Sequence, residues 1–167
     1  MLDIMVGKVE RGFTTMNKLL GAFLMFLMVV TFSSCNDDQN QNRPFIPSVP
    51  VNITVNTDLP LHFHLKNLGS FAYFEGGNRG VFLVHNFDDQ FYALERTCAF
   101  EPDRACSRVE VDSLNFQLRC GELVDGVWEE CCASKYSFDG NLQEGPAQFP
   151  LRRYAVQFNG SLITVRN

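Results

Sequence analysis

Five of the six cysteines of this chain gather in its C-terminal half. Thiolates bind soft metal ions and iron–sulfur clusters, and pairs of thiols oxidise to disulfides in exported proteins. Because five is odd, even two disulfides would leave one thiol free, bound to another chain or bound to a metal. Their spacing lacks the tight C-x2-C pairs of zinc ribbons and does not choose among the possible pairings. The residues are Cys98, Cys106, Cys120, Cys131 and Cys132.

The other polar residues indicate no catalytic centre. All three histidines, His62, His64 and His85, precede the five cysteines in the chain. His62 and His64 would share one face of an extended strand, but no third metal ligand accompanies them, so we interpret this face as solvated. We likewise interpret Asp88-Asp89 and Glu129-Glu130 as solvated turn charges. The sequence therefore predicts that the protein is not an enzyme.

Alternating apolar and polar residues predict the strands that position the cysteines. Asn159-Gly160 lies between two such segments, which is a strong β-hairpin signal. No window of helical length after Pro50 carries an apolar stripe. Residues 51–167 are therefore expected to form one all-β domain, an antiparallel β-sandwich or small barrel. The expected strand segments are residues 51–55, 61–66, 81–84, 91–95, 109–111, 116–119, 153–158 and 162–166.

The N-terminal segment predicts export and lipid anchoring. Lys18 precedes the apolar run Leu19–Phe32, which is shorter than the roughly 20 residues that cross a bilayer as a helix. Small residues then lead into Cys35, an ending that resembles the lipobox of bacterial lipoprotein signal peptides. We expect residues 1–34 to be the signal peptide, with Met16 as the true start. The resemblance implies that Cys35 is the lipidation site.

The segment after the signal peptide and the net charge limit the classes of partner that the protein can bind. Residues 35–50 are rich in Asn, Gln and Pro, which is typical of a flexible tether. Acyl chains on Cys35 would insert into the lipid bilayer, so we expect a bacterial outer-membrane lipoprotein that faces the periplasm or the cell surface. The chain has 14 Lys and Arg against 19 Asp and Glu. This acidic balance excludes nucleic acid as a partner, since nucleic-acid binding requires clustered Lys and Arg that neutralise the phosphates. The other expected partner is a protein of the envelope.

The segment from Ser134 to Ala147 resembles the second cluster loop of Rieske [2Fe–2S] domains. Tyr136, Gly140 and Gly145-Pro146-Ala147 match the spacing that follows the family's C-x-C-H-G-S-x-[FY] motif. Upstream, Cys98-Ala99-Phe100 stands where the family has C-x-H. The resemblance covers residues 81–167 and implies a Rieske-like β domain with a loop subdomain.

The residues at the ligand positions depart from the family. A Rieske cluster is held by two cysteines on one iron and two histidines on the other. Phe100 occupies the first histidine position, and Cys132 occupies the second. Glu129 stands at the second cysteine position, a role that Cys120 could recover if residues 121–130 are an insertion. The resemblance therefore implies a degenerate ligand set.

Two hypotheses follow for the cysteines. In the first, the cluster has been lost and disulfides join the two loops: Cys106–Cys131 in place of the family's own disulfide, and Cys98 with Cys120 or Cys132. The protein would then carry no cofactor and act as a non-catalytic interaction or accessory lipoprotein. In the second, thiolates hold an atypical [2Fe–2S] cluster or a zinc ion, and the cluster-bearing protein would transfer electrons.

Overall fold

The computed structural model describes residues 44–167, which fall within one compact unit, Arg43–Asn167. The expected signal peptide, the start at Met16, Cys35 and most of the tether lie outside the described residues. Across residues 44–167, no helix has the length and apolar character needed to span a membrane.

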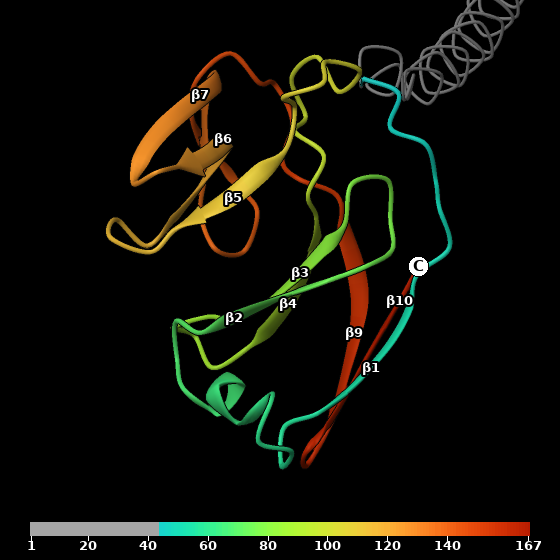
Figure 1. The fold of residues 1–167 in the computed structure, drawn as a ribbon. Helices are drawn as coiled ribbons and strands as arrows, with labels where there is room; N and C mark the ends of the chain where they lie inside the picture. The colour runs from blue at the N-terminus through green and yellow to red at the C-terminus, as the bar shows by residue number, and fades with distance from the viewer. Residues whose placement is uncertain (1–43) are drawn as a thin grey trace, which may run out of the picture. The chain divides into compact units, whose positions relative to one another are not determined.

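A six-stranded antiparallel sheet forms the base of the domain, with strand order β1-β10-β9-β4-β3-β2 (Figure 1). The hairpin at Asn159-Gly160 joins the last two strands, as the sequence predicted. Pairing of β4 with β9 connects this C-terminal hairpin to the β2–β4 meander. The strands are β1 (Asn52–Asn56), β2 (Phe71–Phe74), β3 (Val81–His85), β4 (Phe91–Glu95), β9 (Arg153–Asn159) and β10 (Leu162–Arg166).

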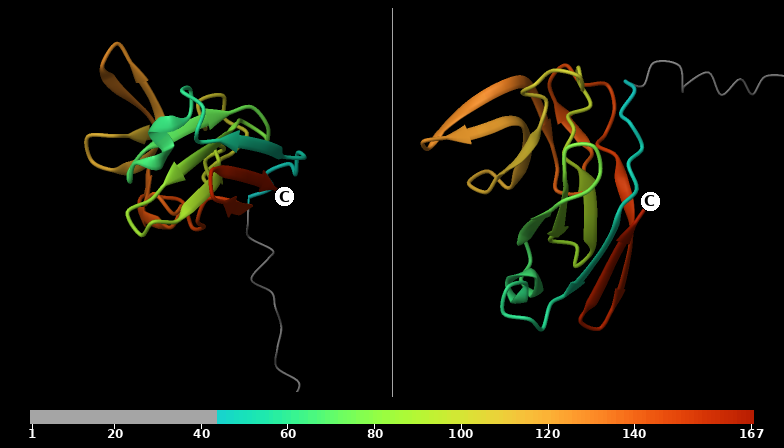
Figure 2. Two further views of the ribbon diagram at one scale, coloured as in Figure 1. Left: turned by 90° about the horizontal axis from the view of Figure 1, so that it is seen from below. Right: turned by 45° about the vertical axis from the view of Figure 1, so that its right-hand side comes forward.

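A four-stranded sheet is inserted between β4 and β9, with strand order β5-β6-β7-β8. Its β6–β7 hairpin projects away from the larger sheet (Figure 2). This insertion corresponds to the loop subdomain that the family resemblance implied. The described residues thus confirm the all-β fold class. The strands are β5 (Val109–Asp112), β6 (Gln117–Val124), β7 (Val127–Tyr136) and β8 (Leu142–Glu144).

Strand β3, next to the edge strand β2, is buried on both faces and divides the core into two clusters. Successive side chains of a strand point to opposite faces. Val81 and Leu83 therefore join one cluster with Leu65 and residues of the C-terminal hairpin. Phe82 and Val84 join the other cluster, which reaches into the smaller sheet and includes Cys98 and Cys120. The larger sheet consequently packs against the cysteine region.

The prediction of a strand at residues 61–66 is wrong. Phe63–Lys66 form a 3-10 turn, η2, in which the Leu65 amide donates to the His62 carbonyl at 3.0 Å. Phe63 is 57% exposed, and Leu65 is fully buried. Because Pro60 cannot donate to a ladder and few of the apolar side chains reach the core, local hydrogen bonds replace sheet pairing. His62 and His64 therefore do not share the face of a strand.

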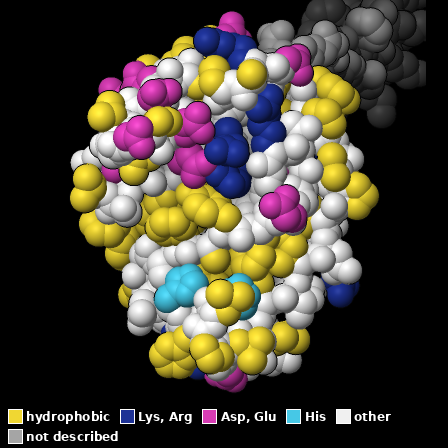
Figure 3. All heavy atoms as spheres, viewed as in Figure 1, with side chains coloured by type: hydrophobic (Ala, Val, Ile, Leu, Met, Phe, Trp, Pro, Cys, Tyr) yellow, Lys and Arg dark blue, Asp and Glu magenta, His cyan; other side chains and the backbone are white. Residues whose placement is uncertain are grey.

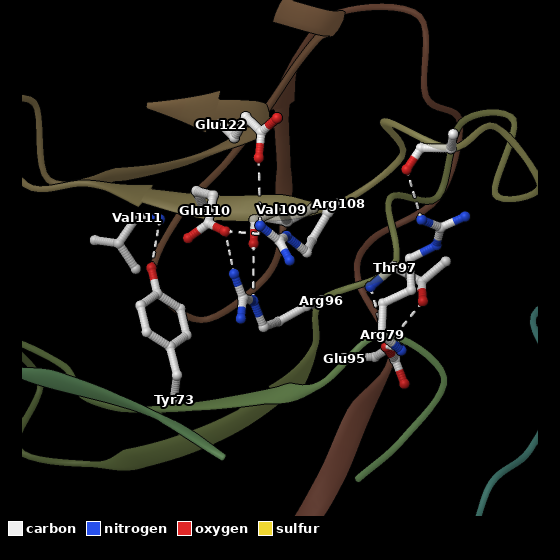
Figure 4. A network of polar contacts seen from close by, with 11 residues as sticks. Tyr73, Arg79, Glu95, Arg96, Thr97, Arg108, Val109, Glu110, Val111 and Glu122 are labelled. Carbon is white, nitrogen blue, oxygen red and sulfur yellow. Dashed lines mark hydrogen bonds and ion pairs between the residues drawn. The ribbon is translucent and has the colours of Figure 1, made fainter. Parts of the chain in front are cut away.

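Polar contacts join the two sheets (Figure 4). The Arg96 guanidinium, beyond the end of β4, donates to the Val109 carbonyl at 3.3 Å and pairs with Glu110 on β5. The Val111 amide donates to the Tyr73 hydroxyl at 3.2 Å, and burial raises the pKa of Tyr73 to about 12. These contacts connect the smaller sheet to β2 and to the end of β4.

On the face shown in Figure 3, acidic and basic side chains lie next to one another over the smaller sheet.

Candidate site of three thiols

Strand β4 leads directly into the loop that carries Cys98. The residue before it, Thr97, pairs with Arg108 in an isolated bridge, and the Cys98 amide donates to the Ser107 carbonyl at 3.2 Å. The loop from 98 to 107 therefore folds back on itself. Cys98 is fully buried at its start, whereas Cys106 near its end is exposed.

A bulge in the β6–β7 hairpin brings the other cysteines to this loop. The ladder pairs that flank the bulge are Arg119–Lys135 and Gly121–Glu130. Cys120 alone on β6 therefore faces residues 131–134 on β7, and the extra residues bend β7. Cys120 therefore lies within β6, and Cys131 and Cys132 lie within β7.

Gly121 makes this bulge possible. Its φ is 140°, and a Cβ at this position would lie 2.2 Å from the Glu129 carbonyl oxygen. Only glycine adopts this conformation and allows this close approach. Residues 121–130 form the distal part of the hairpin beyond the bulge. Without them, Cys120 would directly precede Cys131, whereas the C-x-C-H motif has one residue between these positions.

Three thiols converge at the base of the bulge. The sulfur atoms of Cys98, Cys120 and Cys132 all lie within 4.8 Å of one another. The Cys98 and Cys132 sulfurs are 3.4 Å apart, and the Tyr136 hydroxyl lies 3.8 Å from the Cys98 sulfur. Hydrogen bonds from Cys120 and Cys98 lower the pKa of Cys132, and the hydrogen bond to Cys132 raises the pKa of Cys120. Burial raises the pKa of Tyr136. The group thus favours a thiolate at Cys132.

The remaining two cysteines of the five form a disulfide. Cys106 and Cys131 are joined, as the family resemblance implied, while Cys98, Cys120 and Cys132 are free thiols. The bond ties the first loop to β7. The Arg104 guanidinium adds a hydrogen bond to the Cys131 carbonyl at 3.2 Å. The structure therefore separates the cysteines into a structural pair and a group of three.

The Gly145-Pro146-Ala147 segment supports β7 beside Cys132. The Ala147 amide donates to the Ser134 hydroxyl at 3.1 Å. A Cβ at Gly145 would lie 2.3 Å from the Ala133 carbonyl oxygen, so only glycine permits this approach. The segment therefore fixes the loop against the bulge.

The histidine and acidic residues singled out in the sequence lie outside this group. His85 is buried between the Leu65 carbonyl and Asp89, each at 2.9 Å from a ring nitrogen. Glu129 and Glu130 lie in β7 rather than in a turn, which corrects the expectation for that pair. Among residues 44–167, no histidine or carboxylate joins the three thiols.

The comparisons with known proteins concern the fold. No protein-family model and no curated protein matches the sequence. The chain is similar to the plasma membrane Rieske protein PetC3 of the cyanobacterium Synechocystis PCC 6803, with 23% identity and a TM-score of 0.48 over 70% of this chain and 99% of that one. It is also similar to the ferredoxin of carbazole 1,9a-dioxygenase from Nocardioides aromaticivorans IC177, with 18% identity and a TM-score of 0.43 over 70% of this chain and 95% of that one. The described residues themselves form two antiparallel sheets, an all-β arrangement of the kind that the family resemblance implied.

The residues at the ligand positions that the family resemblance assigns do not fit a Rieske cluster. Phe100, at the first histidine position, has no ligand atom and packs against the core that includes Cys98. Glu129, at the second cysteine position, is exposed and lies opposite Glu122 in the β6–β7 ladder. An all-cysteine [2Fe–2S] cluster requires four thiolates, but the disulfide leaves three thiols in the described part of the chain. The family resemblance identified Tyr136 only by its spacing. The contact of its hydroxyl with the Cys98 sulfur is seen only in the tertiary structure.

Proposed function

We propose that this protein is a lipid-anchored, non-catalytic component of the bacterial outer membrane whose Rieske-like domain has lost the Rieske cluster. The observation that carries the proposal is the replacement of the ligand set: a disulfide joins the first loop to β7, and three thiols and a phenylalanine stand at the former cluster. Such a domain offers a rigid β scaffold. Its role is interaction with another envelope protein or support of an assembly.

The first test concerns the cofactor. Protein expressed with ample iron and purified without reductant is expected to be colourless, with substoichiometric iron and no acid-labile sulfide, because no histidine ligand stands at the site. Visible absorption, iron analysis and sulfide analysis measure this directly. A reddish protein with equal amounts of iron and sulfide would instead establish the alternative function, electron transfer by an atypical cysteine-ligated [2Fe–2S] cluster.

The second test concerns the anchor. Replacing Cys35 with alanine is expected to abolish labelling by a fatty-acid analogue and to release the protein from the membrane fraction or leave it as an uncleaved precursor, because the acylated thiol and amino group would be gone. The matched control is Cys120→Ser, which alters a thiol of the β domain and should leave labelling intact. Unchanged labelling of the Cys35→Ala variant would refute the lipoprotein proposal.

A further inference from the structure

We propose that Cys98, Cys120 and Cys132 form a binding site for one soft monovalent metal ion of the Cu(I) type. The inference rests on the proposed function in one respect: the site is free of an iron–sulfur cluster. The observation behind it is the convergence of three thiols that come from three separate segments of the chain, the loop after β4, strand β6 and strand β7.

The spacing of the sulfur atoms fits a single ion. Three thiolates in a trigonal arrangement around one metal, each about 2.3 Å from it, lie about 4.0 Å apart. In the structure, all three sulfurs are within 4.8 Å of one another, and the pair Cys98–Cys132 is at 3.4 Å. A binuclear cluster needs its ligands in two pairs on two different irons. One group of three mutually close sulfurs matches one metal centre.

The donor set favours a soft ion of low coordination number. Thiolates select Cu(I) and zinc among the biological metals. Structural zinc is almost always four-coordinate, and no fourth thiol, imidazole or carboxylate in the described residues joins this group. Cu(I) has a filled d shell and is commonly held by three thiolates in a trigonal arrangement, so it needs no further ligand. Three sulfur donors therefore suffice for Cu(I), whereas zinc would require water or the Tyr136 hydroxyl.

The surroundings hold the three sulfurs together and leave one side open. Cys98, Cys120 and Tyr136 are each fully buried. Cys132 is partly exposed, which provides a route for an ion to enter. The Cys106–Cys131 disulfide removes the two neighbouring thiols that would otherwise compete for the metal. The site is therefore built by the register of β6 and β7 and by the disulfide, without help from an ion.

Competition titration tests the proposal on the full chain, solubilised in detergent and purified without oxygen or reductant. Cu(I) is supplied as its bathocuproine disulfonate complex, and the expected result is transfer of one equivalent to the protein. Cys98→Ser, Cys120→Ser and Cys132→Ser are each expected to weaken binding by more than about 100-fold, since loss of even an outer partner of a metal ligand costs up to that much. Tyr136→Phe, the matched control, should keep full stoichiometry.

A second measurement on the unaltered protein covers variants that fail to fold. Maleimide should label Cys132 in the metal-free protein, and Cu(I) should protect it, while an excess of Zn²⁺ should protect far less. Failure to withdraw Cu(I) from the chelator, stronger binding of Zn²⁺, or a single free thiol among the three after denaturation would each overturn the inference. These outcomes differ from the detection of iron and sulfide, which would refute the proposed function itself.

Discussion

Replacement of Cys106 and Cys131 together by serine is expected to lower the free energy of unfolding by about 3 kcal/mol. The disulfide closes a loop with a sequence separation of 25, and a cross-link of that length stabilises a fold mainly by restricting the unfolded chain. Urea denaturation followed by tryptophan fluorescence measures the difference, since Trp128 lies on the β6–β7 hairpin.

Reduction of the unaltered protein provides the control for this result. Cys106 is exposed, so a mild reductant should reach the disulfide and produce a similar loss of stability. The same reductant should have little effect on the double variant. Equal stability of the double variant and the unaltered protein would show that the β6–β7 bulge holds its position without the covalent bond.

Replacement of Glu95 by glutamine is expected to destabilise the fold by at least about 3 kcal/mol, because buried donors would lose a charged acceptor. The Glu95 side chain is fully buried. Its carboxylate accepts hydrogen bonds from the Asn78, Arg79 and Thr97 amides at 2.7 to 3.0 Å. It also accepts hydrogen bonds from the hydroxyl of Thr97 at 2.9 Å and from the hydroxyl of Tyr154 at 2.6 Å. Figure 4 shows Glu95 with Arg79 and Thr97 at the end of β4.

Tyr154→Phe is the matched control, because it removes one donor and leaves the others in place. Because the lost hydrogen bond ends on a charged carboxylate, we expect this change to cost about 2 kcal/mol. Thermal and urea denaturation of both variants compare the two costs. If Glu95→Gln were no worse than Tyr154→Phe, the carboxylate would not organise the turn that contains Asn78 and Arg79.

Glu95 also makes stability depend on pH. Burial raises the pKa of this carboxyl, but the hydrogen bonds from Tyr154, Asn78, Arg79 and Thr97 outweigh burial and hold the pKa below its ordinary value of 4.5. A group whose pKa is lowered on folding contributes stability above its ordinary pKa and loses that contribution as the pH falls through the lowered value. The urea concentration at the unfolding midpoint should therefore decrease as the pH is lowered below 4.5. This part of the pH dependence should be absent in Glu95→Gln.

The strands of this protein could largely be predicted from local pattern. The apolar run at 81–84, the segment 91–95 and the alternation at 153–166 predicted strands at the right places, since a strand buries apolar side chains on one face or on both. Alternation failed at residues 61–66, where Pro60 and exposed apolar side chains favour a 3-10 turn. It also missed β2 and β8, since Phe71–Phe74 is apolar throughout and Leu142–Glu144 has a single apolar residue, so neither segment alternates.

The candidate site was determined only in part by the sequence. The cysteine count, the phenylalanine at a histidine position and the family resemblance indicated a degenerate site and implied the Cys106–Cys131 pair. Which three thiols meet was decided by tertiary structure, because it depends on a bulge that sets Cys120 opposite Cys132 and on a loop that returns Cys98 to them. A ladder register is a long-range property of two strands, set by Gly121 and by packing against Gly145. Sequence spacing fixes which residue types are present, but only the register determines which sulfur atoms come within reach of one another.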